Sequence, residues 1–268
     1  MTFTEMLKNA LFKFEELNQA KEAPFSKIIV FVVGLSMLLA IPLTIQVTSV
    51  FYTLKDDGQK IAAAIPDFKI EHGQLVTTEN SEGFVYQTNS IIFTFDPEGK
   101  RESNDISNDM IGNIISIGLL KDELIISLPS VGLSSSILDS SNFRIPYNEP
   151  AIQRLNGDSI RKTLHSATIP WWMQLMIFLV ALYPSFLNLI LTLLMGTFIA
   201  NIYSKLSRHQ GNFFGNLKIF ILAAVVPTII GTIVQLINPN FDATTFVILG
   251  GIFLFAQGTK NGPKIPLA

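Results

Sequence analysis

The chain has 268 residues, a formal net charge of −2 and no cysteine. It is 49% hydrophobic and only 15% charged, whereas soluble globular chains usually carry about 25% charged residues. Disulfides, thiolate metal sites and cysteine nucleophiles are therefore excluded, and the composition indicates an integral membrane protein.

The apolar residues are concentrated in four stretches, and a segment of ordinary soluble composition separates the first from the second. The stretches are Ile28–Phe51, Ile169–Tyr203, Ile219–Ile237 and Thr244–Ala256. A spanning helix needs about 20 consecutive apolar residues, whereas a soluble core spaces its apolar residues at intervals of about 2 or 3.6. We therefore expect a membrane α-helical protein with about four transmembrane helices and an extracytoplasmic α+β domain inserted between the first and second.

Residues 1–27 form the first predicted element, a cytoplasmic amphipathic helix that Pro24 ends. Apolar side chains recur at helical spacing in this segment, as at Phe3, Leu7 and Phe14. Such a helix either lies in the membrane interface with its apolar face down or packs on the cytoplasmic ends of the other spans.

The first transmembrane helix is expected over residues 28–51, with Pro42 inside it. Its apolar run is longer than the roughly 7–15 residues of a signal-peptide core, and 27 residues precede it. A faint cleavage pattern at Ala62–Ala64 lies well beyond the run, so we interpret the segment as an uncleaved signal anchor. The helix is expected to continue past the membrane, through the charged residues 55–60, towards Pro66.

Residues 52–168 predict a small α+β domain of four or five strands. β-branched and aromatic residues favour strands, and Gly and Pro mark the turns between them. The predicted strands are a hairpin over Phe68–Val76 around Gly73, a strand over Ser90–Asp96, and a hairpin formed by Ile114–Leu120 and Leu124–Leu128 around Lys121–Glu123. The predicted helices are Ser103–Ile111 and Ala151–His165, the second capped near Asn148 or Pro150.

The apolar run over residues 169–204 is too long for one straight crossing. As one helix its 35 residues from Ile169 to Tyr203 would extend about 52 Å, against about 30 Å of hydrocarbon. We expect one long helix broken at Pro184 rather than two spans, with Trp171 and Trp172 as membrane-interface anchors. The remaining elements are a cytoplasmic loop at 205–218, a transmembrane helix at 219–237, an outer turn at 238–243, a transmembrane helix at 244–258 and a cytoplasmic tail at 259–268.

The distribution of charge predicts the orientation. Nine lysines and arginines lie in the segments expected to be cytoplasmic, and the outer turn carries only Asp242. This is the positive-inside pattern, and it places both termini of a multi-pass protein in the cytoplasm. Residues 52–168 hold 10 Lys and Arg against 16 Asp and Glu, a net charge of −6 that does not suit nucleic-acid binding.

No catalytic, metal or cofactor motif is present in the sequence. The three histidines have no partner at helical spacing, and the serine-rich stretches 134–136 and 140–141 carry no nucleophile elbow. The best acid–base group is Asp56 and Asp57 with Lys60, and Phe84 and Tyr86 are weak candidates for ligand contacts. The spans contain amides rather than charges, and such amides usually bridge helices. These amides are Gln46, Gln174, Asn188, Asn201, Gln235 and Gln257.

Three short motifs within the predicted outer domain resemble a known family. They are Ile65-Pro66-Asp67-Phe68, Glu71-His72-Gly73-Gln74-Leu75 and Ile91-Ile92-Phe93-Thr94-Phe95-Asp96. The spacing is similar to that of a family of unknown function from low-GC Gram-positive bacteria, often labelled maltodextrin-utilisation protein, MalA-like. The resemblance covers nearly the whole chain and implies a plasma-membrane protein connected with maltodextrin use, but it carries over no catalytic residue.

Three functions remain open from the sequence. The first is a non-enzymatic accessory or regulatory protein, whose outer domain contacts a membrane-protein partner or a second copy and whose spans contact the lipid bilayer. The second is a solute-binding or permeation component, which an enclosed polar cavity among the spans would favour. The third is a membrane enzyme, which would need the Asp56 and Asp57 pair.

Overall fold

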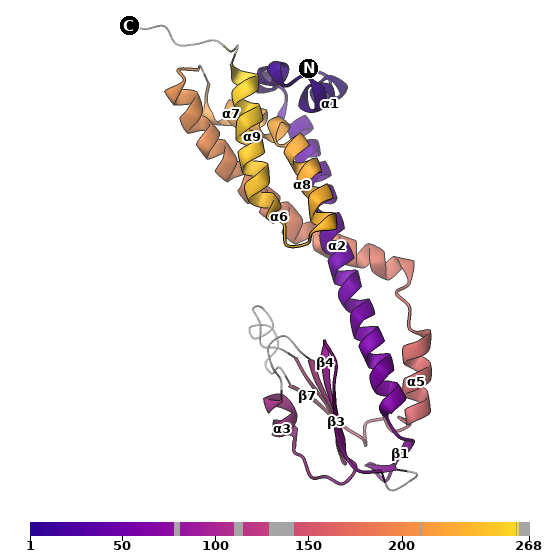
Figure 1. Cartoon of the computed structure of the whole chain (residues 1–268). Coiled ribbons are helices and arrows are strands. Elements are labelled where there is room, and N and C mark those ends of the chain that lie inside the picture. Colours follow the sequence, from indigo (N-terminus) through magenta and orange to yellow (C-terminus); the bar gives the residue numbers. More distant parts are fainter. Residues whose placement is uncertain (78–80, 110–114, 129–141, 210, 261, 263–268) are drawn as a thin grey trace. The chain divides into compact units, whose positions relative to one another are not determined.

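The computed structural model describes residues 1–77, 81–109, 115–128, 142–209, 211–260 and 262. The chain forms two compact units (Figure 1). The helical unit contains Met1–Thr48 and Pro170–Ala268, and the sheet unit contains Ser49–Ile169. The serines at 134–136 and 140–141 lie outside the described residues.

The N-terminal segment is two short helices rather than one. Helix α1 spans Phe3–Phe12 and the 3₁₀ helix η1 spans Phe14–Glu22, with a break at Lys13. One face of these helices is fully buried and packs on helices α7 and α9, described below. The segment therefore packs on other helices, as one of the two alternatives expected, and its place relative to a membrane stays a prediction.

Helix α2, Phe25–Ala64, is 40 residues long and continues through Pro42. The predicted extension beyond the apolar stretch is confirmed. The helix ends just before Pro66, whose ring disfavours helical geometry at the preceding residue. Its residues up to Thr48 belong to the helical unit, and those from Ser49 onward belong to the sheet unit.

Helix α6, Trp171–Leu206, is a single helix of 36 residues that begins after Pro170. It continues through Pro184 and changes direction along its length, so the predicted break bends the helix without ending it (Figure 1). A proline interior to a helix removes one backbone hydrogen bond and commonly bends the helix in this way.

The next apolar stretch forms two helices instead of the single one predicted over 219–237. Helix α7 spans Phe213–Ala223 and helix α8 spans Val225–Ile237, and their axes differ by 43°. Pro227 lies three residues beyond the break and has no N–H to continue the hydrogen-bond ladder. Because α7 begins at Phe213, the predicted polar loop 205–218 is reduced to the residues between α6 and α7.

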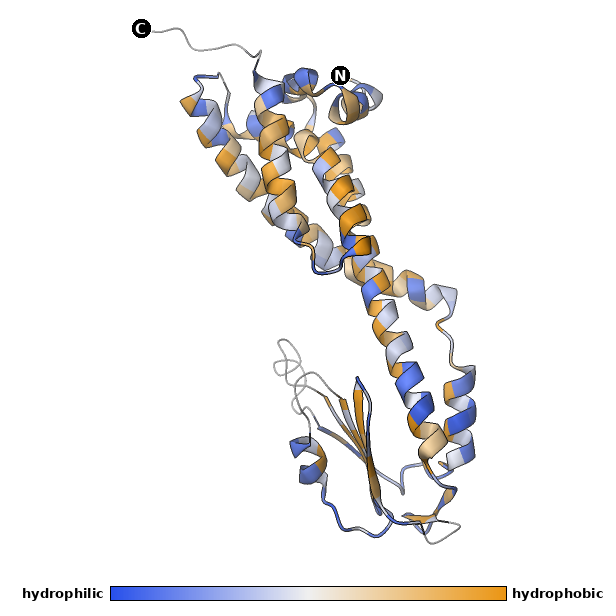
Figure 2. Ribbon diagram, in the orientation of Figure 1, coloured by the Kyte–Doolittle hydropathy of each residue, from blue (hydrophilic) through white to orange (hydrophobic). Residues whose placement is uncertain are grey.

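Helix α9, Ala243–Thr259, has 17 residues and follows a short turn. By length and composition, α2 and α6 could cross a membrane, and the bent pair α7–α8 would be a third crossing if it acts as one span. Figure 2 shows that α6, α8 and α9 of the helical unit are largely apolar along their length, whereas α5 of the sheet unit is hydrophilic.

The core of the helical unit is built around α7. Seven consecutive residues from Ile219 to Val225 are buried, and α7 packs against η1, α6 and α9. The ring of Phe220 occupies space that a side chain would need at Gly196 of α6 and at Gly251 of α9: a Cβ there would lie 2.1 Å and 2.8 Å from its Cζ. Glycine at these positions lets three helices approach closely.

One end of the helical unit gathers the N-terminal helices, the α6–α7 connection and the end of α9 (Figure 1). The Lys218 ammonium on α7 donates hydrogen bonds to the carbonyls of Lys21 (3.0 Å) and Ala23 (2.7 Å) at the end of η1. A Cβ at Gly258 of α9 would lie 2.7 Å from Cβ of Leu17. These contacts bring the cationic segments of the helical unit to the same end.

The sheet unit begins with the predicted hairpin, β1 Phe68–Glu71 and β2 Gln74–Thr77. His72 and Gly73 both have positive φ, 53° and 79°, as a two-residue turn of this type requires. A second sheet has the order β3-β4-β5-β6-β7. Its strands are β3 Phe84–Gln87, β4 Ile91–Phe95, β5 Ile115–Leu119, β6 Glu123–Ser127 and β7 Asn142–Pro146.

The predicted β5–β6 hairpin is confirmed, whereas strands β3 and β7 were not predicted. Helix α3, Ser103–Asn108, makes the crossover between the parallel strands β4 and β5 and packs Ile106 against Gly118. Residue 111, where α3 was predicted to end, lies outside the described part of the chain. The opposite face of the sheet packs its aromatic residues against Ile61 and Ile65 of α2.

Helix α5, Gly157–Ser166, begins six residues later than predicted. Residues 149–154 form turns, and the Asn156 side chain caps the helix by accepting a hydrogen bond from the Ser159 amide. Arg161 of α5 donates to the Ile65 carbonyl (3.1 Å) and pairs with Asp67 and Asp158. These contacts tie α5 to the end of α2 within the sheet unit.

Candidate functional site

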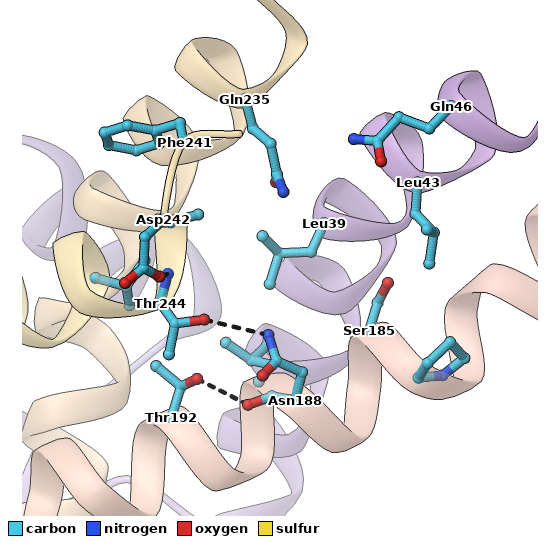
Figure 3. Close-up of a pocket in the computed structure, with 14 residues that line it drawn as sticks. Leu39, Leu43, Gln46, Ser185, Asn188, Thr192, Gln235, Phe241, Asp242 and Thr244 are labelled. Atoms are coloured by element: carbon cyan, nitrogen blue, oxygen red, sulfur yellow. Dashed lines mark hydrogen bonds between the residues drawn. The ribbon is translucent and has the colours of Figure 1, made fainter. Parts of the chain in front are cut away.

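A cavity of about 310 Å³ lies between α2, α6, α9 and the turn from α8 to α9 (Figure 3). All its lining residues belong to the helical unit. They are Leu39, Leu43, Gln46, Pro184, Ser185, Asn188, Leu189, Thr192, Gln235, Phe241, Asp242, Ala243, Thr244 and Val247. Its volume falls at the lower end of the range of about 300–1,000 Å³ that is typical of small-molecule sites.

Three side-chain amides from three different helices reach this cavity. Gln46 comes from α2, Asn188 from α6 and Gln235 from α8, and Figure 3 shows the amides of Gln46 and Gln235 pointing towards one another. Within the described parts of the chain, the side chains of Gln46 and Gln235 form no hydrogen bond with protein. They therefore present unused donors and acceptors to whatever fills the cavity.

Hydroxyl groups add to the polar lining. The Asn188 amide lies 3.5 Å from the Thr244 hydroxyl of α9, a long contact across the cavity wall. The Thr192 hydroxyl donates to the Asn188 carbonyl one turn back (2.8 Å), so it is already used within α6. Ser185 is buried on the same helix face.

Asp242 is the one charged residue in the cavity lining. Its carboxylate caps α9 by accepting hydrogen bonds from the amides of Thr244 (3.0 Å) and Thr245 (3.2 Å) and from the Thr245 hydroxyl. The Thr245 side chain contributes most to lowering the pKa of Asp242, so the group is ionised at neutral pH. Its oxygens are occupied by the helix end, and no lysine, arginine or histidine lines the cavity.

The other part of the lining is apolar. Leu39 and Leu43 of α2 face Leu189 of α6 and Val247 of α9, and Phe241 closes one side from the turn. A wall that is half apolar and half amide can hold a molecule with both C–H surface and hydroxyl groups. It lacks the paired nucleophile and base that acyl or phosphoryl transfer requires.

Of the predicted acid–base group, Asp57 and Lys60 make structural contacts. Asp57 is 2% exposed and accepts hydrogen bonds from the Lys60 ammonium (2.9 Å) and the Ser90 amide (3.1 Å) in the turn between β3 and β4. Burial alone would raise the pKa of Asp57, but hydrogen bonds from Lys60, Thr88 and Ser90 outweigh it and lower the pKa. Asp56 is exposed on the other side of α2.

The weak ligand candidates Phe84 and Tyr86 are part of the core of the sheet unit. Both pack beside Phe93 and Phe95, and the Phe84 ring centroid lies 5.6 Å from that of Phe95. Alternate positions of β3 and β4 therefore place these rings on the face that α2 covers, as a hydrophobic core requires.

Trp171 and Trp172 begin α6 and are 76% and 53% exposed, and Pro184 of the same helix lines the cavity. Among the histidines, His72 and His165 are exposed, whereas His209 is buried. Within the described ranges no cluster of three metal-ligating side chains occurs.

Residues Ser185, Thr192 and Thr244 were missed from the sequence, and the cavity amides were interpreted as bridges between helices. That interpretation is right for Asn201, which accepts a hydrogen bond from Asn216 of α7 (2.9 Å). The sequence did indicate a possible polar site, because amides occur in three separate apolar segments. Only tertiary packing decides which of these amides meet.

Comparison with known proteins identifies a family but no better-characterised relative. A family model described as "Protein of unknown function (DUF1189)" matches residues 4–256. No curated protein and no solved structure matches the chain. The expected membership of an uncharacterised family is thus confirmed, while the label connecting it with maltodextrin stays a prediction. The chain belongs to the DUF1189 family of proteins of unknown function.

Proposed function

We propose that this protein is a non-enzymatic accessory or regulatory protein of the bacterial plasma membrane. It would cross the membrane four times, through α2, α6, the bent pair α7–α8 and α9, with both termini in the cytoplasm. The gathering of Lys21, Lys218 and the end of α9 at one end of the helical unit supports this topology, because it assembles the cationic segments on one side.

The exposed apolar faces of α2 and α6 support a lipid environment. Val30 on α2 and Val180 and Met195 on α6 are each more than half exposed, which is costly in water and favourable in lipid. Helix α9 has 17 residues and is therefore about 26 Å long. A helix of this length crosses the bilayer only with little tilt or where the bilayer is thin.

One observation carries the regulatory role. Helix α2 is continuous from Phe25 to Ala64, and it contributes both to the cavity of the helical unit and, through Asp57, to the sheet unit. A helix that is bonded into both units is suited to communicate a binding event from one to the other.

The outer contact surface can be tested by crosslinking in living cells. A photo-crosslinking amino acid at Val85, which is 54% exposed on the edge strand β3, should form a discrete adduct with another membrane protein. The same probe at Lys162 on α5 is the control for random collision, since it lies on a different exposed face of the sheet unit. If the only adducts at both positions joined two copies of this protein, an accessory role would be contradicted.

A solute-binding component is the second candidate, and the polar cavity favours it. The enzyme alternative has less support, because its best candidate, Asp57, is engaged by Lys60 and Ser90. A connection with maltodextrin use rests on family resemblance, and deletion of the gene would test it: growth on maltodextrin should slow relative to growth on glucose.

A further inference from the structure

We propose that the cavity between α2, α6, α8 and α9 binds an uncharged, hydroxyl-rich group of about the size of one sugar ring. This inference goes beyond the accessory role and does not depend on it. The group would belong either to a free sugar or to the head of a glycolipid, because both offer the same chemistry to the cavity.

The amides select for hydroxyl groups. Each side-chain amide offers a donor and an acceptor, and a hydroxyl group can satisfy both. Gln46 and Gln235 approach the cavity from opposite helices, and within the described residues neither has a protein partner. A bound polyol ring would complete hydrogen bonds that the folded protein leaves open.

The charges of the lining argue against ionic ligands. An anion such as a phosphate would meet no cationic side chain and would be repelled by the Asp242 carboxylate. A cation would find a single carboxylate, which already accepts hydrogen bonds from the Thr244 and Thr245 amides and the Thr245 hydroxyl, whereas cation sites usually gather several such oxygen ligands. Neutral polar groups meet neither obstacle.

The apolar part of the lining fits the remaining surface of a sugar. The C–H faces of a pyranose ring pack well on aromatic and aliphatic side chains, and Phe241 and Leu43 supply such surface beside the amides. In a glycolipid, the acyl chains would continue along the exposed apolar faces of α2 and α6.

Two substitutions remove the selecting groups with little risk to the fold. Gln46→Leu and Gln235→Leu keep the approximate size of the side chain and break no hydrogen bond within the described chain. Gln174→Leu is the matched control, because Gln174 is an exposed amide on α6 that does not line the cavity. Unchanged melting temperatures without ligand would show that all three variants fold.

The experiment measures thermal unfolding of the full chain, purified in a detergent without a sugar head group. Free glucose and monoglucosyl diacylglycerol are the two probes, and phosphatidylglycerol with the same acyl chains is the charged comparison. At about 100-fold excess over Kd, the wild type and Gln174→Leu should melt about 5–10 °C higher with a sugar-bearing probe. The double variant of Gln46 and Gln235 should lose most of that shift.

The two probes separate the sources of the ligand. A shift with free glucose assigns the site to a soluble sugar, and a shift with the glucolipid alone assigns it to a lipid head group. The proposal would be overturned if neither probe raised the melting temperature. It would also be overturned if the double variant kept the full rise in melting temperature, or if phosphatidylglycerol produced an equal rise. None of these results depends on the crosslinking result at Val85, so the two proposals fail separately.

Discussion

At the scale of single residues, two carboxylates of the described chain, Asp57 and Asp242, accept hydrogen bonds from backbone amides. Asp57 holds the amide of Ser90 in the β3–β4 turn, and Asp242 holds the first amides of α9. Both positions satisfy N–H groups that would otherwise lack partners at the end or turn of an element. Asp57 therefore makes a structural contact between α2 and the sheet, and the acid–base role considered for it from the sequence stays a prediction.

Replacing Asp57 should weaken the sheet unit. Asp57→Asn removes the charge that accepts hydrogen bonds from Lys60 and Ser90, and charge-assisted bonds of this kind contribute about 1.5–3 kcal/mol. We expect a loss of this size in the free energy of unfolding, measured by chemical denaturation of the full chain in micelles. Asp56→Asn, on the exposed neighbouring position, should change stability by less than about 0.5 kcal/mol.

The same contact predicts a dependence on pH. The pKa of Asp57 is lower in the folded chain than its ordinary value, so its contribution to stability is complete above that value and is lost as pH falls towards the folded pKa. The difference in stability between wild type and Asp57→Asn should be constant from about pH 5 to 8 and shrink below about pH 4. A difference that persists undiminished at pH 3 would show that the charge of Asp57 is not its source.

At the scale of elements, the helical unit depends on the close approach of α6, α7 and α9. The ring of Phe220 fills the space beside Gly196 and Gly251, so helix contact here requires the absence of a side chain. The bend between α7 and α8 has a local origin in Pro227, and Pro227 in turn packs on Gly250 of α9. Glycine and proline thus decide both the spacing and the path of these helices.

Gly196→Ala should destabilise the helical unit. Its Cβ would lie 2.1 Å from the Phe220 ring, and overpacking of this kind costs about 1–3 kcal/mol. Gly34→Ala on α2 is the control, because a Cβ there meets nothing within 4 Å, and it should be neutral or slightly stabilising. Combining Gly196→Ala with Phe220→Leu should recover part of the loss in melting temperature; no recovery would contradict the assignment to Phe220.

At the scale of the whole molecule, the two units are joined by α2 and by residues before α6. The proposed topology places the α6–α7 connection inside the cell and places the α8–α9 turn and the sheet unit outside. The chain contains no cysteine, so a single introduced thiol reports on one position without background.

A membrane-impermeant maleimide tests this topology in intact cells. Asn240→Cys in the α8–α9 turn and Glu82→Cys in the sheet unit should be labelled directly. Ser207→Cys, beyond the end of α6, should be labelled only after the membrane is permeabilised. Labelling of Ser207→Cys in intact cells would contradict the four-span arrangement.

Local signals in the sequence predicted several elements correctly. The His72-Gly73 hairpin, the β5–β6 hairpin and the extension of α2 follow from turn residues, alternation of apolar residues and helix propensity over short distances. The start of α5 was wrong because Asn156, not Asn148, provides the capping side chain. Strands β3 and β7 were missed because edge strands carry a weak pattern, with burial on one side only.

The sequence by itself determined that apolar helices accompany one sheet-containing unit, because hydrophobic length and strand alternation are properties of contiguous residues. Only the tertiary structure decided that α7 is the buried centre of the helical unit and that Gln46, Asn188 and Gln235 line one cavity. These amides lie in separate segments far apart along the chain. Which of them meet depends on how glycine, proline and large rings set the distances between helices, and no local pattern encodes those distances.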